Sequence, residues 1–226
     1  MTEALWRDAY AREAEGTVVS VDGQTVRLDR TLFYPEGGGQ PADHGMLSWG
    51  GSEARVVHAA KDGADVVLTL EGPVPSDGAV VAQTLDWERR NLHMRMHTAL
   101  HLLSVVIPLP VTGGSIGAEK SRLDFAMPEP LDKEAVEAAL NDLIARNMAV
   151  SEEWVADEDL DEGLVKTLRV MPPRGQGRVR LVRIGDVDLQ PCGGTHVAKT
   201  GEIGRIRIGK VEKKGRENRR VAIHFA

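Results

Sequence analysis

Short segments in which hydrophobic and polar residues alternate fill the first 85 positions of the chain. Two of them lie within residues 15–30, on either side of Asp22 and Gly23, a pair that favours a hairpin turn. The apolar positions of this hairpin are Val19, Val21, Val26 and Leu28. Further segments follow, separated by glycine-containing turns, at 45–49, 52–60 and 65–72. Many short strands in so few residues predict a small β-barrel or sandwich.

The hydrophobic pattern changes to a helical period after residues 72–78, a stretch rich in proline and glycine. Residues 86–107 contain neither glycine nor proline, begin with acidic side chains and space their apolar side chains as an α-helix does. Pro108 ends this predicted helix because proline cannot continue the backbone hydrogen bonds. We therefore expect a β-barrel domain over residues 1–85 and a second domain over residues 86–226.

The second domain mixes predicted strands with further helices. A second amphipathic helix is expected at 131–150 and a short one near 157–168. The apolar stripe of the second helix comprises Leu131, Ala135, Ala138, Ala139 and Ile144. Strands are expected at 121–127, 178–184, 201–211 and 219–225. Because strands and helices alternate without a regular βαβ rhythm, the expected fold class is α+β: a small N-terminal β-barrel, then an α/β domain whose long helix packs on a mainly antiparallel sheet.

The composition is that of an ordinary globular protein, with 42% hydrophobic and 27% charged residues among 226. Cys192 has no cysteine partner in the chain, which excludes a disulfide scaffold and leaves a thiol, a metal ligand or a small buried residue. No stretch approaches the roughly 20 apolar residues of a membrane span, and the mixed-charge N-terminus does not resemble a signal peptide. We therefore expect a cytoplasmic protein without a membrane partner.

The formal net charge of −6 hides an uneven distribution of charged residues. Residues 129–163 hold twelve acidic residues against two basic ones, a balance of −10. Residues 164–183 hold six basic residues and no acid, and residues 199–226 hold nine basic residues against three acids, so each block carries +6. The basic blocks predict either a surface that binds a polyanion or strands whose basic side chains simply face the solvent.

Four residues with metal-binding chemistry occur in two closely spaced pairs. His97 and His101 are four apart on the predicted long helix, so both imidazoles can point to one spot. Cys192 and His196 are separated by Gly193, Gly194 and Thr195, which predicts a tight loop. Three nitrogens and one sulfur suit Zn²⁺ in a tetrahedral arrangement. His93 lies one turn before His97 and is either a partner of the ligands or a solvated helix position, of which we expect the second.

The same ligand set leaves the role of the metal open. Four protein ligands are typical of a closed structural site, whereas catalytic zinc keeps one position for water or substrate. The HExxH peptidase mechanism is excluded because Thr98, and not a glutamate, follows His97. The residues therefore allow a structural zinc, a site with one loosely held ligand, or a hydrolytic zinc.

Several motifs, in this order, resemble the editing domain of alanyl-tRNA synthetase. They are HTALHLL at 97–103, GGSIGAEKSRLDF at 113–125, CGGTH at 192–196 and KKGRENRRV at 213–221. FYPEGGGQPADHG at 33–45 is similar to the segment that precedes this domain in free-standing alanyl-tRNA editing proteins of the AlaX type. The resemblance runs from about Arg30 to the C-terminus, and the aminoacylation domain of the synthetase is not present in it.

The resemblance implies hydrolysis, in trans, of the ester between a wrong amino acid, chiefly serine and also glycine, and the 3′ end of tRNA(Ala). It implies that His97, His101, Cys192 and His196 hold zinc and that no nucleotide cofactor is needed. One departure is Leu100, because editing sites of the synthetase often carry threonine just before the second histidine. Without that hydroxyl, Thr98, Ser115 or Thr195 is expected to serve, or the amino-acid preference differs.

From this resemblance we expect Thr98, Gln40 and Thr195 to act in catalysis. The expected substrate contacts are Gly37, Gly38, Gly39, Ser115, Lys120, Arg122, Lys213, Lys214, Arg216, Arg219 and Arg220, the basic members on tRNA phosphates. Residues 37–40 have a second interpretation as a sharp structural turn. The chain is expected to be a monomer. Editing of Ser-tRNA(Thr), a non-catalytic tRNA-binding module with structural zinc, and a metallohydrolase of small esters are the alternative functions.

Overall fold

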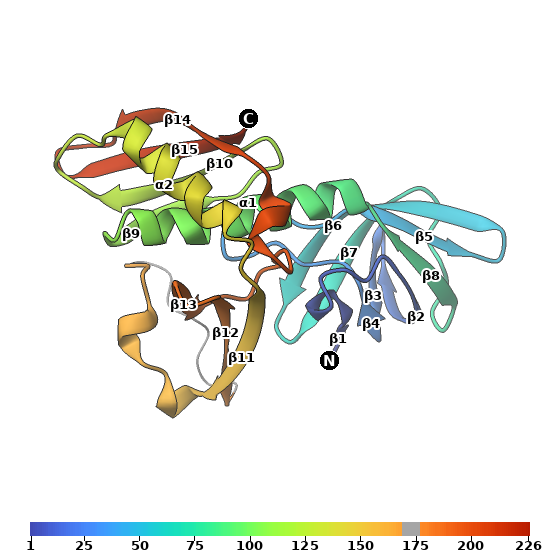
Figure 1. The fold of residues 1–226 in the computed structure, drawn as a ribbon. Helices are drawn as coiled ribbons and strands as arrows, with labels where there is room; N and C mark the ends of the chain where they lie inside the picture. Colours follow the sequence, from blue (N-terminus) through green and yellow to red (C-terminus); the bar gives the residue numbers. More distant parts are fainter. Residues whose placement is uncertain (169–176) are drawn as a thin grey trace. The chain divides into compact units, whose positions relative to one another are not determined.

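The computed structural model describes residues 1–168 and 177–226 (Figure 1). The chain forms two compact units, Met1–Asn91 and Leu92–Ala226. The division between the units falls within the long helix α1 (Trp87–Val106). No helix in the described part of the chain is long and apolar enough to cross a membrane.

The first unit contains a closed barrel in which every neighbouring pair of strands is antiparallel. Around the barrel, the strands are β2 (Glu13–Asp22), β3 (Thr25–Leu28), β7 (Asp65–Glu71), β6 (Ser52–Asp62), β5 (Gly45–Trp49) and β8 (Val80–Leu85). A parallel pair, β1 (Glu3–Ala4) and β4 (Arg30–Thr31), and the 3-10 turn η1 (Leu5–Arg7) complete the unit. Of the two architectures that the strand pattern allowed, a barrel and a sandwich, the first unit has the barrel.

The predicted hairpin is formed by β2 and β3, with Val21 opposite Val26. A bulge between Val18 and Ser20 shifts the register, so that Val18 is buried while Val19 is 61% exposed. Val19, although one of the apolar residues of the predicted hairpin, therefore does not contribute to the barrel interior. The barrel interior is filled mainly by aliphatic side chains, among them Val18, Val26, Leu28, Leu47, Val56, Leu68, Leu70 and Val81.

A buried ion pair joins the start of α1 to the loop that follows Phe33. The guanidinium of Arg90 and the carboxylate of Asp43 are both fully buried and in contact. Arg90 also donates to the carbonyl oxygens of Leu32 (2.8 Å) and Ala9 (3.1 Å). The same oxygen of Asp43 accepts a hydrogen bond from the amide of Tyr34 at 2.7 Å. Because neither charge reaches water, each depends on the other for compensation.

The second unit contains two antiparallel sheets. One has the order β14 (Ile206–Lys213), β15 (Asn218–Phe225), β10 (Lys120–Ala126), β9 (Val111–Ser115). The other has the order β11 (Val150–Ala156), β12 (Arg178–Ile184), β13 (Asp188–Pro191). The helix α2 (Lys133–Ala145) lies along β14 (Figure 1), where the side chain of Asn141 exchanges hydrogen bonds with the backbone of Ile206.

The long helix has the limits that the sequence predicted, to within one residue. The carboxylate of Asp86 accepts a hydrogen bond from the amide of Arg89 at 3.1 Å and so caps the first turn of α1. Farther along, Arg95 donates twice to the carbonyl oxygen of Ile203 and stacks on the ring of Phe225 at 4.2 Å. These contacts hold α1 against β15 and the turn η4 (Thr200–Ile203).

The second helix is shorter than predicted, and its buried side chains are different. α2 ends at Ala145, and Asn147 adopts a left-handed φ of 50° that no helix continues. The expected stripe was wrong for Ala135 and Ala138, which are exposed. The buried positions are Val136, Leu140 and Ile144, four residues apart. Larger side chains at one helical spacing, and not the alanines, therefore form the contact face.

Two other predictions for the second unit were wrong. The short helix near 157–168 is replaced by two 3-10 turns, η2 (Asp157–Asp159) and η3 (Glu162–Leu164). Five acidic residues in six positions repel one another, and the side chain of Asp161 caps η3 through the amide of Gly163. The strand expected at 201–211 begins only at Ile206, because its first residues form η4.

Candidate metal centre

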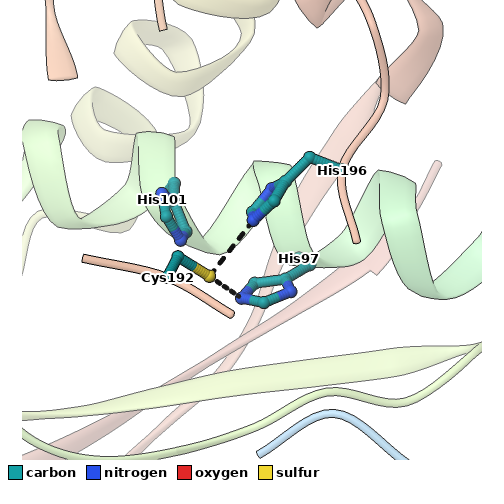
Figure 2. A group of neighbouring side chains, drawn as sticks. All are labelled: His97, His101, Cys192 and His196. Carbon is teal, nitrogen blue, oxygen red and sulfur yellow. Dashed lines mark hydrogen bonds between the residues drawn. The ribbon is translucent and has the colours of Figure 1, made fainter. Parts of the chain in front are cut away.

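Both predicted ligand pairs meet at one place in the second unit. His97 and His101 lie one turn apart on α1, and Cys192 and His196 lie in the loop that follows β13. One ligand atom from each side chain falls within 4.8 Å of all the others. Figure 2 shows the four side chains pointing toward one another, with the Cys192 sulfur 3.4 Å from His97 Nε2 and 3.2 Å from His196 Nε2.

The loop that carries Cys192 is held by an arginine of the neighbouring strand. Arg180 on β12 donates from one Nη atom to the carbonyl oxygens of Cys192 and Gly194, both at 2.9 Å. The amide of Cys192 in turn donates to the carbonyl oxygen of Arg180 at 3.1 Å. The amide of Gly194 donates to the Cys192 sulfur at 3.4 Å, a contact that favours the thiolate.

The ionisation of Cys192 and His196 suits a metal ligand set. Burial alone raises the pKa of the Cys192 thiol, but the neighbouring imidazoles of His97 and His196 and hydrogen bonds from His101 and His196 hold that pKa well below its usual range. Burial and the charge of His97 lower the pKa of His196 to about 3, so this imidazole is neutral at pH 7. A thiolate and neutral imidazoles are the forms that bind zinc.

His101 differs because it has an acidic partner on its far side. Burial alone lowers its pKa, but hydrogen bonds to Asp188 and Cys192 raise that pKa to about 9. This ring would therefore have to lose a proton before it could serve as a metal ligand. The four donor atoms and their mutual distances fit Zn²⁺.

Thr98 lies behind His196, and its side chain is fully buried. Its hydroxyl donates to the carbonyl oxygen of Met94 at 2.9 Å, and this bond uses the one hydrogen that the hydroxyl has. It must then accept from His196 Nδ1 at 3.1 Å and from the amide of Val197 at 3.3 Å. This arrangement places the proton of His196 on Nδ1 and leaves Nε2 free toward Cys192.

A buried polar cluster behind His101 escaped the sequence interpretation. Asp188 accepts from His101 Nδ1 at 3.2 Å and from the Gln190 amide at 2.7 Å, and it pairs with Lys166 at 2.5 Å. The available signal was the alternation Asp188, Gln190, Cys192, which places three polar side chains on one face of a strand. Of these three residues only Cys192 belongs to a recognisable motif, so the pattern alone does not identify the cluster.

The other expected site residues fall in different places. Thr195 is buried within the loop that carries Cys192 and His196, Ser115 is exposed at the end of β9, and Leu100 is buried. His93 is also buried, so the expectation of a solvated position was wrong. Gln40 is fully buried within the first unit, whereas the four candidate metal ligands belong to the second.

The glycine-rich loop of the first unit forms a tight turn. The amides and carbonyls of Gly37 and Gln40 exchange two hydrogen bonds, at 3.1 and 3.0 Å. Between them, Gly38 and Gly39 have φ angles of 61° and 83°, a left-handed geometry that favours glycine at both positions. The hydroxyl of Tyr34 donates to the carbonyl oxygen of Gly37 at 3.0 Å and fixes the turn further.

Much of the basic charge of residues 164–183 is paired within the fold. Arg180 and Arg183 contact Glu152 and Glu153 across β11 and β12, so these residues of the basic block and the acidic block neutralise each other. Arg169 and Arg174 lie outside the described residues. This block therefore offers less free positive charge than its sequence suggested.

The expected phosphate contacts differ in how far they are engaged. Asp124 binds Arg220 through two hydrogen bonds at 2.8 and 2.9 Å, and Arg122 at 3.0 Å. Arg219 donates to the carbonyl oxygens of Pro128 and Glu129, and Lys214 pairs with Glu212 at 2.8 Å. Lys120, Lys213 and Arg216 are exposed. The exposed lysines and arginine are the basic side chains most available to an anion.

Comparisons with known proteins give matches along nearly the whole chain. A family model described as the threonyl and alanyl tRNA synthetase second additional domain matches residues 179–222, and one described as tRNA synthetases class II (A) matches residues 5–89. An alanyl-tRNA editing protein AlaX-M from Methanosarcina mazei is 39% identical over 240 residues, which cover 98% of this chain and 95% of that protein.

Longer proteins match over only part of their length. An alanyl-tRNA editing protein AlaX-L from Pyrococcus horikoshii is 35% identical over 93% of this chain and 54% of its own length. An alanine–tRNA ligase from Pyrobaculum calidifontis is 39% identical over 93% of this chain, but only 25% of that protein is covered. The chain is thus similar in extent to the AlaX-M protein and to a part of the other two.

Proposed function

This chain belongs to the AlaX family of alanyl-tRNA editing proteins, and from that membership we propose that it hydrolyses, in trans, the ester of misacylated tRNA(Ala), chiefly Ser-tRNA(Ala) and also Gly-tRNA(Ala). The observation that carries the proposal is the convergence of His97, His101, Cys192 and His196 on one spot. Such an enzyme meets a physical need. A pocket for alanine favours alanine over an amino acid with one extra hydroxyl, such as serine, by no more than roughly a hundredfold, so a second, hydrolytic site is needed.

We propose zinc as the ion that these four side chains hold. When bound, zinc supplies a Lewis acid that polarises the ester carbonyl or lowers the pKa of water. The residues around it do the positioning: Thr98 orients His196, and Arg180 fixes the loop that carries Cys192. The backbone amides of this loop are proposed to face the oxygen that becomes negative during hydrolysis, with Thr195 next to it.

We propose that the two parts of the chain divide the recognition of tRNA. The second part, residues 86–226, would bind phosphates through exposed Lys120, Lys213 and Arg216, and through spare donors of the paired side chains of Arg122, Lys214, Arg219 and Arg220. The barrel, residues 1–85, would present the turn 37–40, whose glycines allow close approach of the tRNA end. Because Gln40 is buried, we assign it to holding this turn and not to direct contact with the ester. The proposal includes a cytoplasmic monomer.

A substrate comparison tests the proposed function. Purified protein mixed with radiolabelled Ser-tRNA(Ala), Gly-tRNA(Ala) and Ser-tRNA(Thr) is expected to deacylate the first two well above the spontaneous rate and to leave the third near that rate. The rate on Ser-tRNA(Ala) should fall steeply with added salt, because phosphate contacts release counterions. A small serine ester serves as the control for hydrolysis that does not need the tRNA body.

Ser-tRNA(Thr) is the one other substrate that a specific observation favours. The family model that matches residues 179–222, including Cys192 and His196, is shared by threonyl and alanyl tRNA synthetases. Activity on Ser-tRNA(Thr) alone would assign the chain to this second function. Equal hydrolysis of the small ester and of Ser-tRNA(Ala) would contradict both assignments.

A further inference from the structure

We propose that Asp188 is a positioning residue of the metal centre, which fixes the tautomer and orientation of His101 so that Nε2 faces the metal position. The inference rests on the proposed zinc site and assigns a role to the polar cluster behind it. In many metal sites a histidine ligand donates its other ring N–H to a carboxylate, and this hydrogen bond makes the imidazole a better ligand.

The geometry of the pair leaves one choice for the proton of His101. Asp188 lies on β13, its side chain is fully buried, and its Oδ2 lies 3.2 Å from His101 Nδ1. An ionised carboxylate can only accept, so in the neutral ring that a metal requires Nδ1 carries the hydrogen and the lone pair is on Nε2. With the opposite tautomer the ring would have no lone pair to offer on the side of Cys192.

The carboxylate is itself held in place by buried partners. Gln190 donates to the oxygen that His101 contacts, at 2.7 Å, and Lys166 pairs with the other oxygen. Lys166 and Gln190 also reach the hydroxyl of Ser104, at 3.2 and 3.4 Å. That hydroxyl donates to the carbonyl oxygen of His101 at 2.7 Å. Asp188 is thus tied to the same helix that carries the ligand, so ring and carboxylate keep a fixed distance.

The partners differ in what they contribute to metal binding. The negative charge of Asp188 raises the electron density on His101, whereas Lys166 partly cancels that charge. Loss of the carboxylate should therefore weaken zinc binding, and loss of the ammonium group should not. A cluster that served only as a structural ion pair would respond equally to the loss of either partner.

The experiment measures the zinc affinity of the full chain by competition with a chromophoric chelator. Asp188→Asn is expected to weaken zinc binding by about 10- to 100-fold, the usual effect of removing such a partner. Lys166→Met is expected to bind zinc at least as tightly as the wild type. Asp186→Asn is the matched control: it removes an exposed carboxylate that lies two residues beyond the end of β12 and pairs with Arg146, and it should not change the affinity. The cobalt(II) spectrum of Asp188→Asn should shift as well, because the His101 ligand field weakens.

Several results would overturn the inference. Unchanged zinc affinity in Asp188→Asn, or equal weakening in Asp188→Asn and Lys166→Met, would reduce the cluster to a structural role. If Asp188→Asn does not fold, nitrogen-15 NMR of the zinc-loaded wild type decides, since His101 must then show a proton on Nδ1 and metal on Nε2, and the reverse contradicts the proposal. Failure of the wild type to bind zinc at all would instead contradict the proposed zinc site.

Discussion

Replacing Cys192 with alanine should remove tight zinc binding and lower the rate of Ser-tRNA(Ala) hydrolysis by more than about 100-fold, while tRNA affinity stays within about twofold. Loss of an outer partner of a metal ligand already costs about 10- to 100-fold, and in the proposed site Cys192 supplies the sulfur ligand itself. Its thiolate also contacts both His97 and His196, so its loss leaves two imidazoles without their shared neighbour. Metal analysis, a deacylation assay and a filter-binding assay on one preparation measure the three effects.

Gly193→Ala is the matched control for this substitution. A methyl group at Gly193 meets no atom within 4 Å, and the residue does not need a left-handed backbone, so zinc binding should remain at wild-type strength. Retained hydrolysis in Cys192→Ala would show that the thiolate is not needed. An unfolded Cys192→Ala protein, with Gly193→Ala folded, would instead assign the zinc a structural role.

Replacing Arg90 with methionine should destabilise the first unit by about 3 to 5 kcal/mol, the cost of leaving one partner of a buried ion pair without compensation. The substitution leaves the buried carboxylate of Asp43 without its cationic partner. The carbonyl oxygens of Leu32 and Ala9 also lose the hydrogen bonds that Arg90 donates to them. Urea unfolding followed by tryptophan fluorescence suits this measurement. Three of the four tryptophans, at positions 6, 49 and 87, belong to the first unit.

The neighbouring arginine provides the control. Arg89 is half-buried and donates to the carbonyl oxygen of Ala42 at 3.1 Å, so Arg89→Met should cost only about 1 kcal/mol, the worth of one hydrogen bond. An Arg90→Met variant no less stable than Arg89→Met would contradict the account of the buried pair. A loss of stability in both units together would show that the two unfold as one.

Features set by local chemistry could be predicted from the sequence. The long helix was placed correctly because Asp86 can cap it and Pro108 cannot extend it. The four candidate ligands, which the structure brings together, could be singled out because His97 and His101 have helical spacing and Cys192 is the single cysteine of the chain. In each case the signal lies within a few residues and does not depend on distant contacts.

Features set by distant contacts could not be predicted. The strand β8 was missed because its inward position 83 holds glutamine and not an apolar residue. Only the fold shows that Gln83 accepts from Thr31 and the amide of Leu32 and donates to Arg30. Strands β11 and β13 were missed for a similar reason, since partners across the sheet, such as Arg183 for Glu153, compensate their polar side chains. The role proposed for Asp188 could not be predicted either, because only the fold shows that Lys166 and Gln190 contact its carboxylate.

The account rests on hydrolysis at a zinc site, and one titration tests that claim most directly. Deacylation of Ser-tRNA(Ala) is followed with protein first stripped of metal by a chelator and then reloaded with increasing zinc. The account predicts that activity is lost on stripping and returns in proportion to bound zinc, reaching its full value at one ion per chain. Full activity in stripped protein that still folds, or no activity after one ion has bound, would contradict it.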